Sequence, residues 1–155
     1  MENRERNEAI LKIVCEILEK LGVSVESAFA EDVEGDEGQV LVGIKLSDPS
    51  RLIGAYGRNL SALQTVARLA VKKAFGDEVR VVVDVNDYRV EQKERLLRMA
   101  KSMAEKVKTT GQEVVMVPMS SYERRICHMA VAEVEGVVSE SEGEGVERHV
   151  VIKLG

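Results

Sequence analysis

The hydrophobic pattern of the chain changes between helical and strand spacing several times, and the order of these changes limits the fold more than any other feature. Apolar residues recur at helical spacing over 4–21 and again after residue 58, whereas those over 39–46 alternate as in a half-buried strand. The first half therefore predicts a helix over 4–21, strands over 23–32 and 39–46, a helical turn over 51–53, a helix over 58–75 and a strand over 79–85.

Turn and capping residues support these boundaries. The cluster over 34–38 is rich in glycine and acidic residues, so it predicts a hairpin between the first two strands. Asp48 is placed to cap the short helical turn, Pro49 suits its first position, and Gly76 closes the longer helix. The continuous run over 81–83 predicts a strand that is buried on both faces or central in the sheet. We expect a three-stranded sheet with helices packed on one side.

The second half repeats the mixture of helices and strands on a smaller scale. It predicts an amphipathic helix over 88–109, a short strand over 114–117, a helix capped by Ser120 or Ser121 that runs to about residue 134, and a hairpin formed by 137–141 and 148–154. Val66 and Val90 are both assigned to the apolar faces of their helices. We therefore expect an α+β chain of two domains, over residues 1–86 and 87–155.

Charge is unevenly distributed along the chain. The net charge is −5, which by itself argues against a ligand as acidic as a nucleic acid. Residues 1–50 hold 5 basic and 12 acidic side chains, residues 51–132 hold 15 and 9, and residues 133–155 hold 2 and 6. Phosphate affinity follows the local charge, so the basic centre favours nucleic-acid binding. The alternative is that these cations only solvate two long helices.

Several classes of protein do not fit the sequence. No apolar run is long enough for a membrane helix, and the first six residues are too polar for a secretory signal, so we expect no membrane contact and a cytoplasmic location. Cys15 and Cys127 are expected to be free, reduced and partly buried. No Cys/His cluster has the spacing of metal ligands, and we predict neither a metal nor any other cofactor.

Two glycines three residues apart, Gly54 and Gly57, interrupt the helical stretch in the basic centre. Glycine turns tightly with positive φ and lacks the Cβ that would keep a phosphate away. The helix that follows presents unpaired backbone N–H groups, and Arg51 and Arg58 add positive charge beside the loop. A nucleic-acid backbone could pass over such a loop. A plain helix–turn–helix connection with a glycine C-cap is the alternative.

With these elements around it, residues 1–86 resemble a type II KH domain of order helix–strand–strand–helix–helix–strand, whose signature loop matches Ile53-Gly54-Ala55-Tyr56-Gly57. The resemblance implies that the loop clamps a single-stranded backbone of four nucleotides. One departure matters, because Ala55 and Tyr56 stand where KH loops often carry a Lys or Arg. The positive charge must then come from Arg51, Arg58 and the second domain. Tyr56 either stacks on a base or is merely exposed.

Arg124 and His128 lie four residues apart on a predicted helix, so both point the same way and could hold one phosphate. Residues 87–155 resemble an R-3-H domain, which is named for such an Arg and His. The KH and R-3-H order, the segment 118–125 and the tail 141–152 together resemble the bacterial Jag family. That resemblance implies single-stranded RNA binding, with pairing to a small single-KH protein in some relatives.

We therefore predict non-catalytic binding of single-stranded RNA in post-transcriptional regulation, with single-stranded DNA left open as a second ligand. The predicted RNA-binding residues are Arg51, Ile53, Gly54, Ala55, Tyr56, Gly57, Arg58, Arg124, Arg125 and His128. A protein–protein scaffold, in which the KH fold forms a homodimer or a heterodimer with a small KH protein, is the main alternative. A nuclease that uses Tyr122, Glu123 and His128 is a further one, and it lacks a carboxylate cluster for metal ions.

Overall fold

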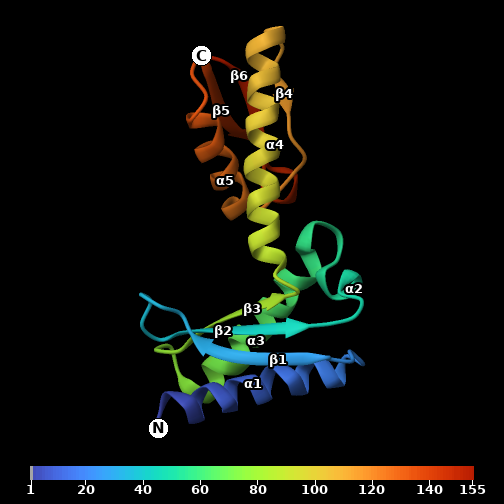
Figure 1. Cartoon of the computed structure of the whole chain (residues 1–155), viewed down its shortest axis with the longest axis vertical. Coiled ribbons are helices and arrows are strands. Elements are labelled where there is room, and N and C mark those ends of the chain that lie inside the picture. The colour runs from blue at the N-terminus through green and yellow to red at the C-terminus, as the bar shows by residue number, and fades with distance from the viewer. Residues whose placement is uncertain (1) are drawn as a thin grey trace. The chain divides into compact units, whose positions relative to one another are not determined.

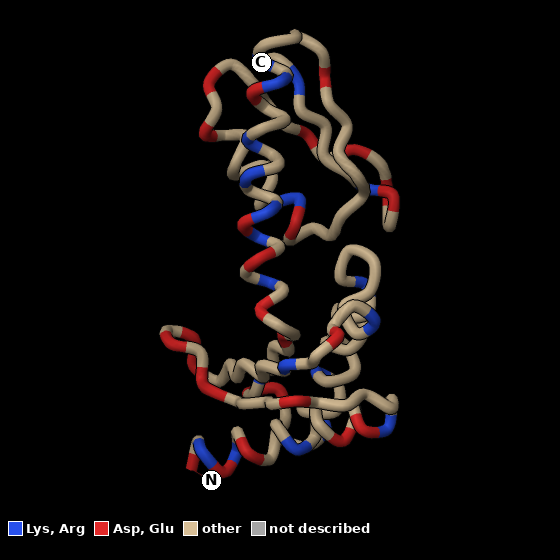
Figure 2. Tube along the Cα trace, turned by 45° about the vertical axis from the view of Figure 1, so that its right-hand side comes forward, with Lys and Arg blue, Asp and Glu red and all other residues tan. Residues whose placement is uncertain are grey.

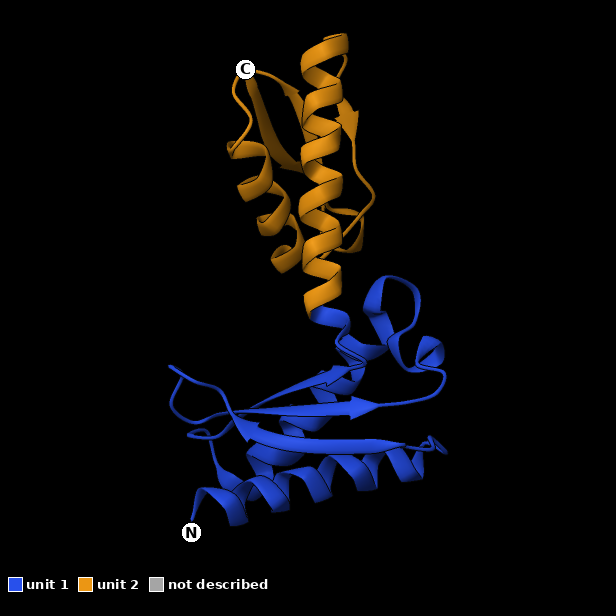
Figure 3. Ribbon diagram, in the orientation of Figure 1, with its two compact units in different colours: residues 1–89 blue, residues 90–155 orange. Residues whose placement is uncertain are grey.

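A computed structural model of the chain describes residues 2–155. The chain divides into two compact units, residues 1–89 and residues 90–155 (Figure 3). The sequence places the domain boundary after residue 86, just before the helix that begins at Tyr88 and continues into the second unit. Each unit has a hydrophobic core and a three-stranded sheet of its own.

The first unit has the predicted order of elements. These are α1 (Asn3–Lys20), β1 (Ser27–Asp32), β2 (Gln39–Lys45), α2 (Ser50–Ile53), the 3-10 turn η1 (Ala55–Gly57), α3 (Arg58–Phe75) and β3 (Arg80–Val85). The sheet order is β1-β2-β3, with β1 antiparallel and β3 parallel to β2. The expectation that the 81–83 run is central or buried on both faces was wrong. Strand β2 is the central strand, and Val82 on β3 is only half-buried.

Two long helices cover one face of this sheet, as expected (Figure 1). They bury one residue per turn against alternate strand residues, which yields a single aliphatic core: Ile10, Val14 and Leu18 from α1, Leu60, Leu63, Ala67 and Val71 from α3, and Val40, Val42, Val81, Val83 and Val85 from the sheet. Val66 does not belong to this face, because its side chain is 50% exposed. It lies one position before Ala67, which is the residue that points at the core.

Side chains satisfy the outward backbone groups of β3, which is an edge strand of the sheet. Along β3, the Gln64 side chain donates to the carbonyl of Val81 (2.6 Å) and accepts from the N–H of Val83 (2.7 Å). The Arg89 guanidinium also donates to the carbonyl of Val83 (3.0 Å). These side chains close the β3 edge and hold the parallel strand beside α3. Sequence patterns could not indicate this, because Gln64 reads as an ordinary polar helix residue.

The second unit consists of a sheet packed against two helices. Its elements are α4 (Tyr88–Thr110), β4 (Val114–Val115), α5 (Ser121–Ala132), β5 (Val137–Glu142), the 3-10 turn η2 (Gly145–Glu147) and β6 (His149–Leu154). The strand order is β4-β6-β5, antiparallel throughout, which confirms the predicted final hairpin. The core contains Leu96, Ala100, Ala104, Val107, Ile126, Ala130, Val150 and Ile152. Val90 is 59% exposed, so its assignment to the apolar face of α4 was wrong.

The two cysteines are free, as expected. Cys15 is half-buried on α1, and Cys127 is fully buried on α5. Burial raises the pKa of the Cys127 thiol to about 11, so this thiol stays protonated at neutral pH. Its sulfur lies 3.6 Å from the Met119 sulfur and helps to fix the chain before α5. This contact is structural and places Met119 beside the predicted Arg–His pair.

Candidate nucleic-acid interface

The loop between α2 and α3 is held in left-handed backbone conformations. Gly54 has φ 73° and Gly57 has φ 74°, and Tyr56 between them has φ 55° and ψ 27°. Glycine adopts such angles without steric cost, whereas tyrosine rarely does. The Gly57 N–H donates to the Gly54 carbonyl (3.3 Å), which closes the loop on itself. The two glycines therefore meet a real backbone requirement, and Tyr56 carries local strain.

Both glycines also make room for neighbouring side chains. A Cβ on Gly54 would lie 2.7 Å from the Asn59 side chain, and one on Gly57 would lie 3.0 Å from the Tyr88 ring. The Asn59 amide donates to the Arg51 carbonyl (2.6 Å), so it ties the start of α3 to the end of α2. Sequence reasoning did not include Asn59 in the site. Its only signal was a polar side chain directly after the loop.

The start of α3 has the features of an anion site. Its N-cap is Gly57, which offers no side chain to the first turn, and no acidic residue lies in that turn. The helix dipole places partial positive charge there. Arg51 and Arg58 are exposed beside it, and neither forms an ion pair with any residue that the structure describes. Positive charge thus flanks the loop without a direct ion pair among the described residues.

The remaining loop residues differ in exposure. Ala55 and Tyr56 are exposed, with the Tyr56 side chain at 63%, whereas Ile53 is half-buried and packs against the core. Before the loop, the Asp48 carboxylate accepts from the N–H (3.2 Å) and hydroxyl (2.6 Å) of Ser50, but Asp48 lies one position before the N-cap, so the expectation that it caps α2 was wrong. Pro49 occupies the N-cap position of α2 rather than the first helical position. The loop therefore presents Ala55 and the Tyr56 ring to solvent.

The predicted Arg–His pair lies on α5, whose N-terminus is fixed by a capping box. The Ser120 hydroxyl accepts from the Glu123 N–H (3.3 Å), and the Glu123 carboxylate accepts from the Ser120 N–H (2.9 Å). Ser120 is therefore the cap, and Ser121 is the first helical residue. Arg124 donates through Nη1 to the Met119 carbonyl (2.8 Å), and Arg125 is exposed on the next position.

His128 is enclosed by two hydroxyl groups. Its Nδ1 lies 2.7 Å from Ser139 Oγ, and its Nε2 lies 2.8 Å from Ser141 Oγ. Both serines face α5 from β5, two residues apart on one face of the strand. Burial lowers the pKa of His128 below its ordinary value, and the positive charges of Arg124 and Arg148 lower it further. The imidazole is therefore mainly neutral at pH 7.

Three members of this cluster were missed by sequence reasoning: Ser139, Ser141 and Arg148. The serines carry a usable signal, because they alternate with Glu140 and Glu142 as in a strand with one face toward a helix. Arg148 carries none, since it lies 20 residues after His128 and its approach depends on the turn that joins β5 to β6. The predicted residues thus fall into two groups, one in each unit.

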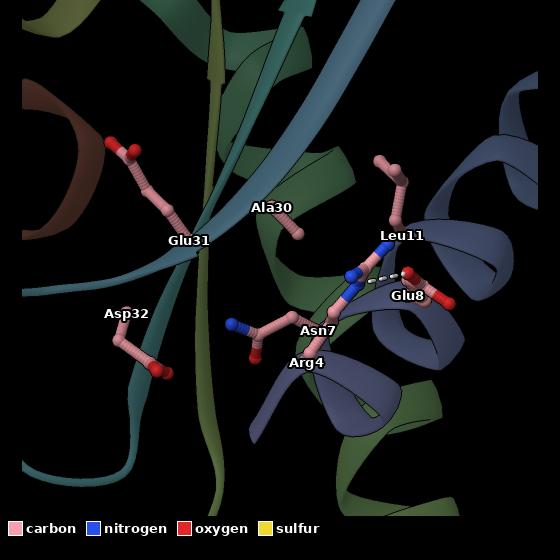
Figure 4. A pocket seen from close by; sticks show the side chains of 7 residues that line it. All are labelled: Arg4, Asn7, Glu8, Leu11, Ala30, Glu31 and Asp32. Carbon is pink, nitrogen blue, oxygen red and sulfur yellow. Dashed lines mark hydrogen bonds and ion pairs between the residues drawn. The ribbon is translucent and has the colours of Figure 1, made fainter. Parts of the chain in front are cut away.

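The first unit also contains a hollow of about 450 Å³ between α1 and β1. Figure 4 shows Arg4, Glu8 and Asn7 on the helix side and Ala30, Glu31 and Asp32 on the strand side. Arg4 pairs with Glu8 (3.1 Å), and Arg6 pairs with Asp32 nearby. The cations here are already neutralised, and Glu31 adds a negative charge that has no ion pair within residues 2–155. This hollow is therefore unsuited to a phosphate backbone.

Among residues 2–155, no group of three or more His, Cys, Asp or Glu side chains is arranged to hold a metal ion. No helix in the same range is both long and apolar enough to span a bilayer.

Comparison with known proteins identifies both units. Residues 7–85 match the family model for the KhpA/KhpB KH domain, and residues 94–154 match that for the R-3-H domain. A protein named RNA-binding protein KhpB from Clostridium symbiosum is 38% identical over 152 residues, which is 97% of this chain and 68% of that protein. Proteins of the same name are 33% identical over 150 residues in Lactiplantibacillus plantarum and 37% identical over 103 residues in Bacillus subtilis.

The share of each relative that is matched varies. The match with the Lactiplantibacillus protein covers 96% of this chain and 46% of that protein. The match with the Bacillus protein covers 65% of this chain and 50% of that protein. It thus covers about half of these two relatives and two thirds of the Clostridium one. The matches run through both units in the order that the fold shows. The chain therefore belongs to the KhpB, or Jag, family, in which a KH domain is followed by an R-3-H domain.

Proposed function

We propose that the chain binds single-stranded RNA through the α2–α3 loop and the Arg124–His128 cluster, and that it does not catalyse a reaction. The observation that carries this proposal is the Gly54–Gly57 loop at the uncapped, acid-free start of α3. Exposed Arg51 and Arg58 flank it without internal ion pairs among the described residues. Phosphate groups are the natural partners of such a surface.

The relatives support the choice of ligand, because the proteins matched over both units are named RNA-binding proteins. KH loops take single strands, whose bases can turn away from the backbone. Neither group of residues distinguishes a 2′-hydroxyl by its chemistry alone, so single-stranded DNA is the ligand to compare. Within this proposal the chain acts in the cytoplasm in post-transcriptional regulation.

The geometry of His128 supports a non-catalytic role. A general base needs a ring nitrogen that is free to take a proton from the reacting group. Both nitrogens of His128 are already engaged by Ser139 and Ser141. Tyr122 is exposed, and the Glu123 carboxylate is engaged in the capping box of α5. We expect RNA to remain intact during long incubation with the pure protein and magnesium.

The loop assignment is tested by adding negative charge without disturbing the glycines. Gly57→Asp is a poor choice, because its Cβ would press on the Tyr88 ring and could unfold the loop. Ala55→Asp is better, since Ala55 is exposed and an acidic side chain suits the start of a helix. We expect affinity for single-stranded RNA to fall roughly tenfold or more, with unchanged thermal stability, because like charges would meet at the phosphate.

Ala74→Asp is the matched control. It makes the same change at an exposed position near the end of α3, about 24 Å from the start of that helix at 1.5 Å per residue. RNA affinity should stay at the parental value in this variant. If the folded Ala55→Asp protein binds RNA as tightly as the Ala74→Asp protein, the loop is not the binding site.

A second candidate function, pairing of the first unit with another KH fold, is favoured by the open edge of β1. The Val33 N–H donates to the Gln39 carbonyl (3.0 Å), so in this antiparallel register the N–H and C=O groups of Ala28, Ala30 and Asp32 point away from β2. Unlike the β3 edge, this edge could accept a strand from a partner. Acidic side chains beside it, including Glu8 and Glu31, favour a less acidic partner over a second copy of this chain.

Light scattering tests this pairing. We expect the chain to be monomeric alone and to form a one-to-one complex with a small single-KH protein. Ala30→Pro removes an outward N–H from an edge strand, where proline is tolerated, and should abolish the complex while the unit stays folded. A complex that forms equally well with the Ala30→Pro chain would rule out the β1 edge as the pairing surface.

A further inference from the structure

Both ring nitrogens of His128 are occupied within the protein, which limits what this residue can do for a ligand. Ser139 Oγ lies 2.7 Å from Nδ1 and Ser141 Oγ lies 2.8 Å from Nε2. A neutral imidazole has one donor and one acceptor, so it donates to one serine and accepts from the other. A phosphate that bound His128 directly would have to displace one of these bonds. The simple expectation that His128 donates to a phosphate therefore conflicts with the geometry.

The serine hydroxyls, in contrast, retain binding capacity. The serine that accepts from the imidazole N–H keeps its own O–H hydrogen, which is free to donate outward. Ser139 and Ser141 are half-buried, so each still has a surface that faces solvent. His128 thus fixes the position of two hydroxyl groups on β5, at least one of which can act as a donor to an anion.

Two guanidinium groups are anchored beside this hydroxyl pair. Arg124 donates to the Met119 carbonyl (2.8 Å), and the Met119 N–H donates to the Arg148 carbonyl (3.2 Å), so one residue links both arginines. The Arg148 guanidinium in turn donates to the Gly143 carbonyl (2.8 Å), which fixes the turn between β5 and β6. Both positive charges act on the His128 ring. Each arginine is held by a neutral carbonyl and keeps further N–H donors.

These two cations have no ion-pair partner in the part of the chain that the structure describes. Over residues 2–155, neither Arg124 nor Arg148 forms an ion pair. Two other carboxylates of this unit, Glu140 and Glu133, pair with Lys153 (2.9 Å) and Lys101 (2.5 Å). Two fixed guanidinium groups and one free hydroxyl donor, with no ion-pair partner among residues 2–155, form a site suited to a phosphate.

We propose that the phosphate site of the second unit consists of Arg124, Arg148 and the hydroxyl of Ser139 or Ser141, whichever accepts from the imidazole N–H, and that His128 is a positioning residue rather than a phosphate ligand. The ligand is a phosphodiester of a single-stranded nucleic acid, so this inference rests on the proposed function. It adds Arg148 and the Ser139–Ser141 pair to the site, and it changes the role that was predicted for His128.

The contribution of Arg148 is tested with the full chain and a short single-stranded RNA. Arg148→Gln should weaken affinity roughly tenfold, the usual effect of losing a charge-assisted hydrogen bond. Arg98→Gln makes the same charge change at an exposed position of α4 in the same unit, and it should leave affinity within about twofold of the parent. Equal affinities of the two folded variants would overturn the assignment of Arg148.

The role of His128 is tested with a double-mutant cycle. If His128 acts only through the serines, His128→Ala and the double variant Ser139→Ala/Ser141→Ala each weaken binding, and combining all three substitutions adds nothing. A further loss in the triple variant would mean that His128 contacts the phosphate itself and would overturn the positioning role. Ser139→Thr/Ser141→Thr keeps both hydroxyls and should retain most of the affinity, which a purely structural role of the serines would not require.

Two controls keep the outcomes separate. Thermal unfolding establishes that each variant is folded, and if His128→Ala is not, the comparison of the Ser→Ala and Ser→Thr pairs decides the role of the hydroxyls. A parent chain that binds no single-stranded RNA would refute the proposed function as a whole. A parent that binds RNA, together with Arg148→Gln and Ser→Ala variants that bind equally well, would refute this inference alone.

Discussion

At the scale of single residues, Tyr56 is the position where the backbone and the proposed function make opposite demands. Its left-handed conformation (φ 55°) is unfavourable for an aromatic residue, and its ring is 63% exposed. Strained residues persist at sites where their geometry is used. A tyrosine ring held out from the proposed phosphate-binding loop is placed to stack on a base, which would supply affinity that the uncharged loop otherwise lacks.

Tyr56→Asn tests this trade-off, because asparagine tolerates left-handed angles and has no ring. We expect thermal stability to be equal to or above that of the parent. RNA affinity should fall by about 1–3 kcal/mol, the range measured for one base–aromatic stack. Fluorescence anisotropy with labelled RNA and a thermal melt measure the two quantities. Unchanged affinity would show that the ring is merely exposed.

His128 makes stability depend on pH in a defined direction. Burial, Arg124 and Arg148 lower its pKa in the folded state, so below the ordinary histidine value the unfolded chain binds the extra proton more readily. Stability should therefore decrease as pH falls from neutral through the interval between the ordinary and the lowered pKa. Thermal melts between pH 7.5 and about pH 5 measure this. His128→Asn should show a smaller decrease; an identical pH profile would contradict the assignment.

At the scale of elements, spacing predicted nearly all helices and strands and both hairpins, but not the place of β3 in its sheet. The apolar run over 81–83 suggested a central strand, yet β3 lies at the edge of the sheet. Gln64 and Arg89 supply the hydrogen bonds that a neighbouring strand would otherwise provide. Such side-chain substitutes for a strand depend on tertiary structure, so periodicity cannot reveal them.

The candidate site shows the same division. Arg124 and His128 are one helical turn apart, so their common face follows from spacing alone. Ser139 and Ser141 reach His128 only because β5 packs against α5. Arg148 approaches His128 only because the turn after β5 reverses the direction of the chain. The contacts close in sequence were predictable, whereas those that cross between elements required the fold.

The capping box of α5 is the element-scale feature that fixes Arg124. Ser120→Ala removes the side-chain acceptor for the Glu123 N–H and should reduce the free energy of unfolding by about 1 kcal/mol. RNA affinity should also fall, since Arg124 lies in the first turn of this helix. Ser121→Ala is the matched control and should have little effect on either quantity. Chemical unfolding and RNA titration of both variants provide the comparison.

At the scale of the whole molecule, the net charge of −5 does not show how basic and acidic side chains are distributed. The turn between β1 and β2 is acidic, with Glu34, Asp36 and Glu37, whereas basic residues occur beside the loop and along α3 and α4 (Figure 2). Each unit contributes a separate group of cations without ion-pair partners in the described part of the chain. The fold class, the order of the two domains and the family follow from the sequence pattern and the comparisons together.

The salt dependence of RNA affinity tests the central claim most directly, because every phosphate that the protein neutralises releases counterions. We expect the logarithm of the affinity to fall linearly with the logarithm of salt concentration, by about 0.7 per phosphate for a single strand. The Ala55→Asp and Arg124→Gln variants should each give a shallower slope than the parent, since each loses contacts in one unit. A parental slope near zero, or slopes that neither variant changes, would contradict the clamping of an RNA backbone by these two sites.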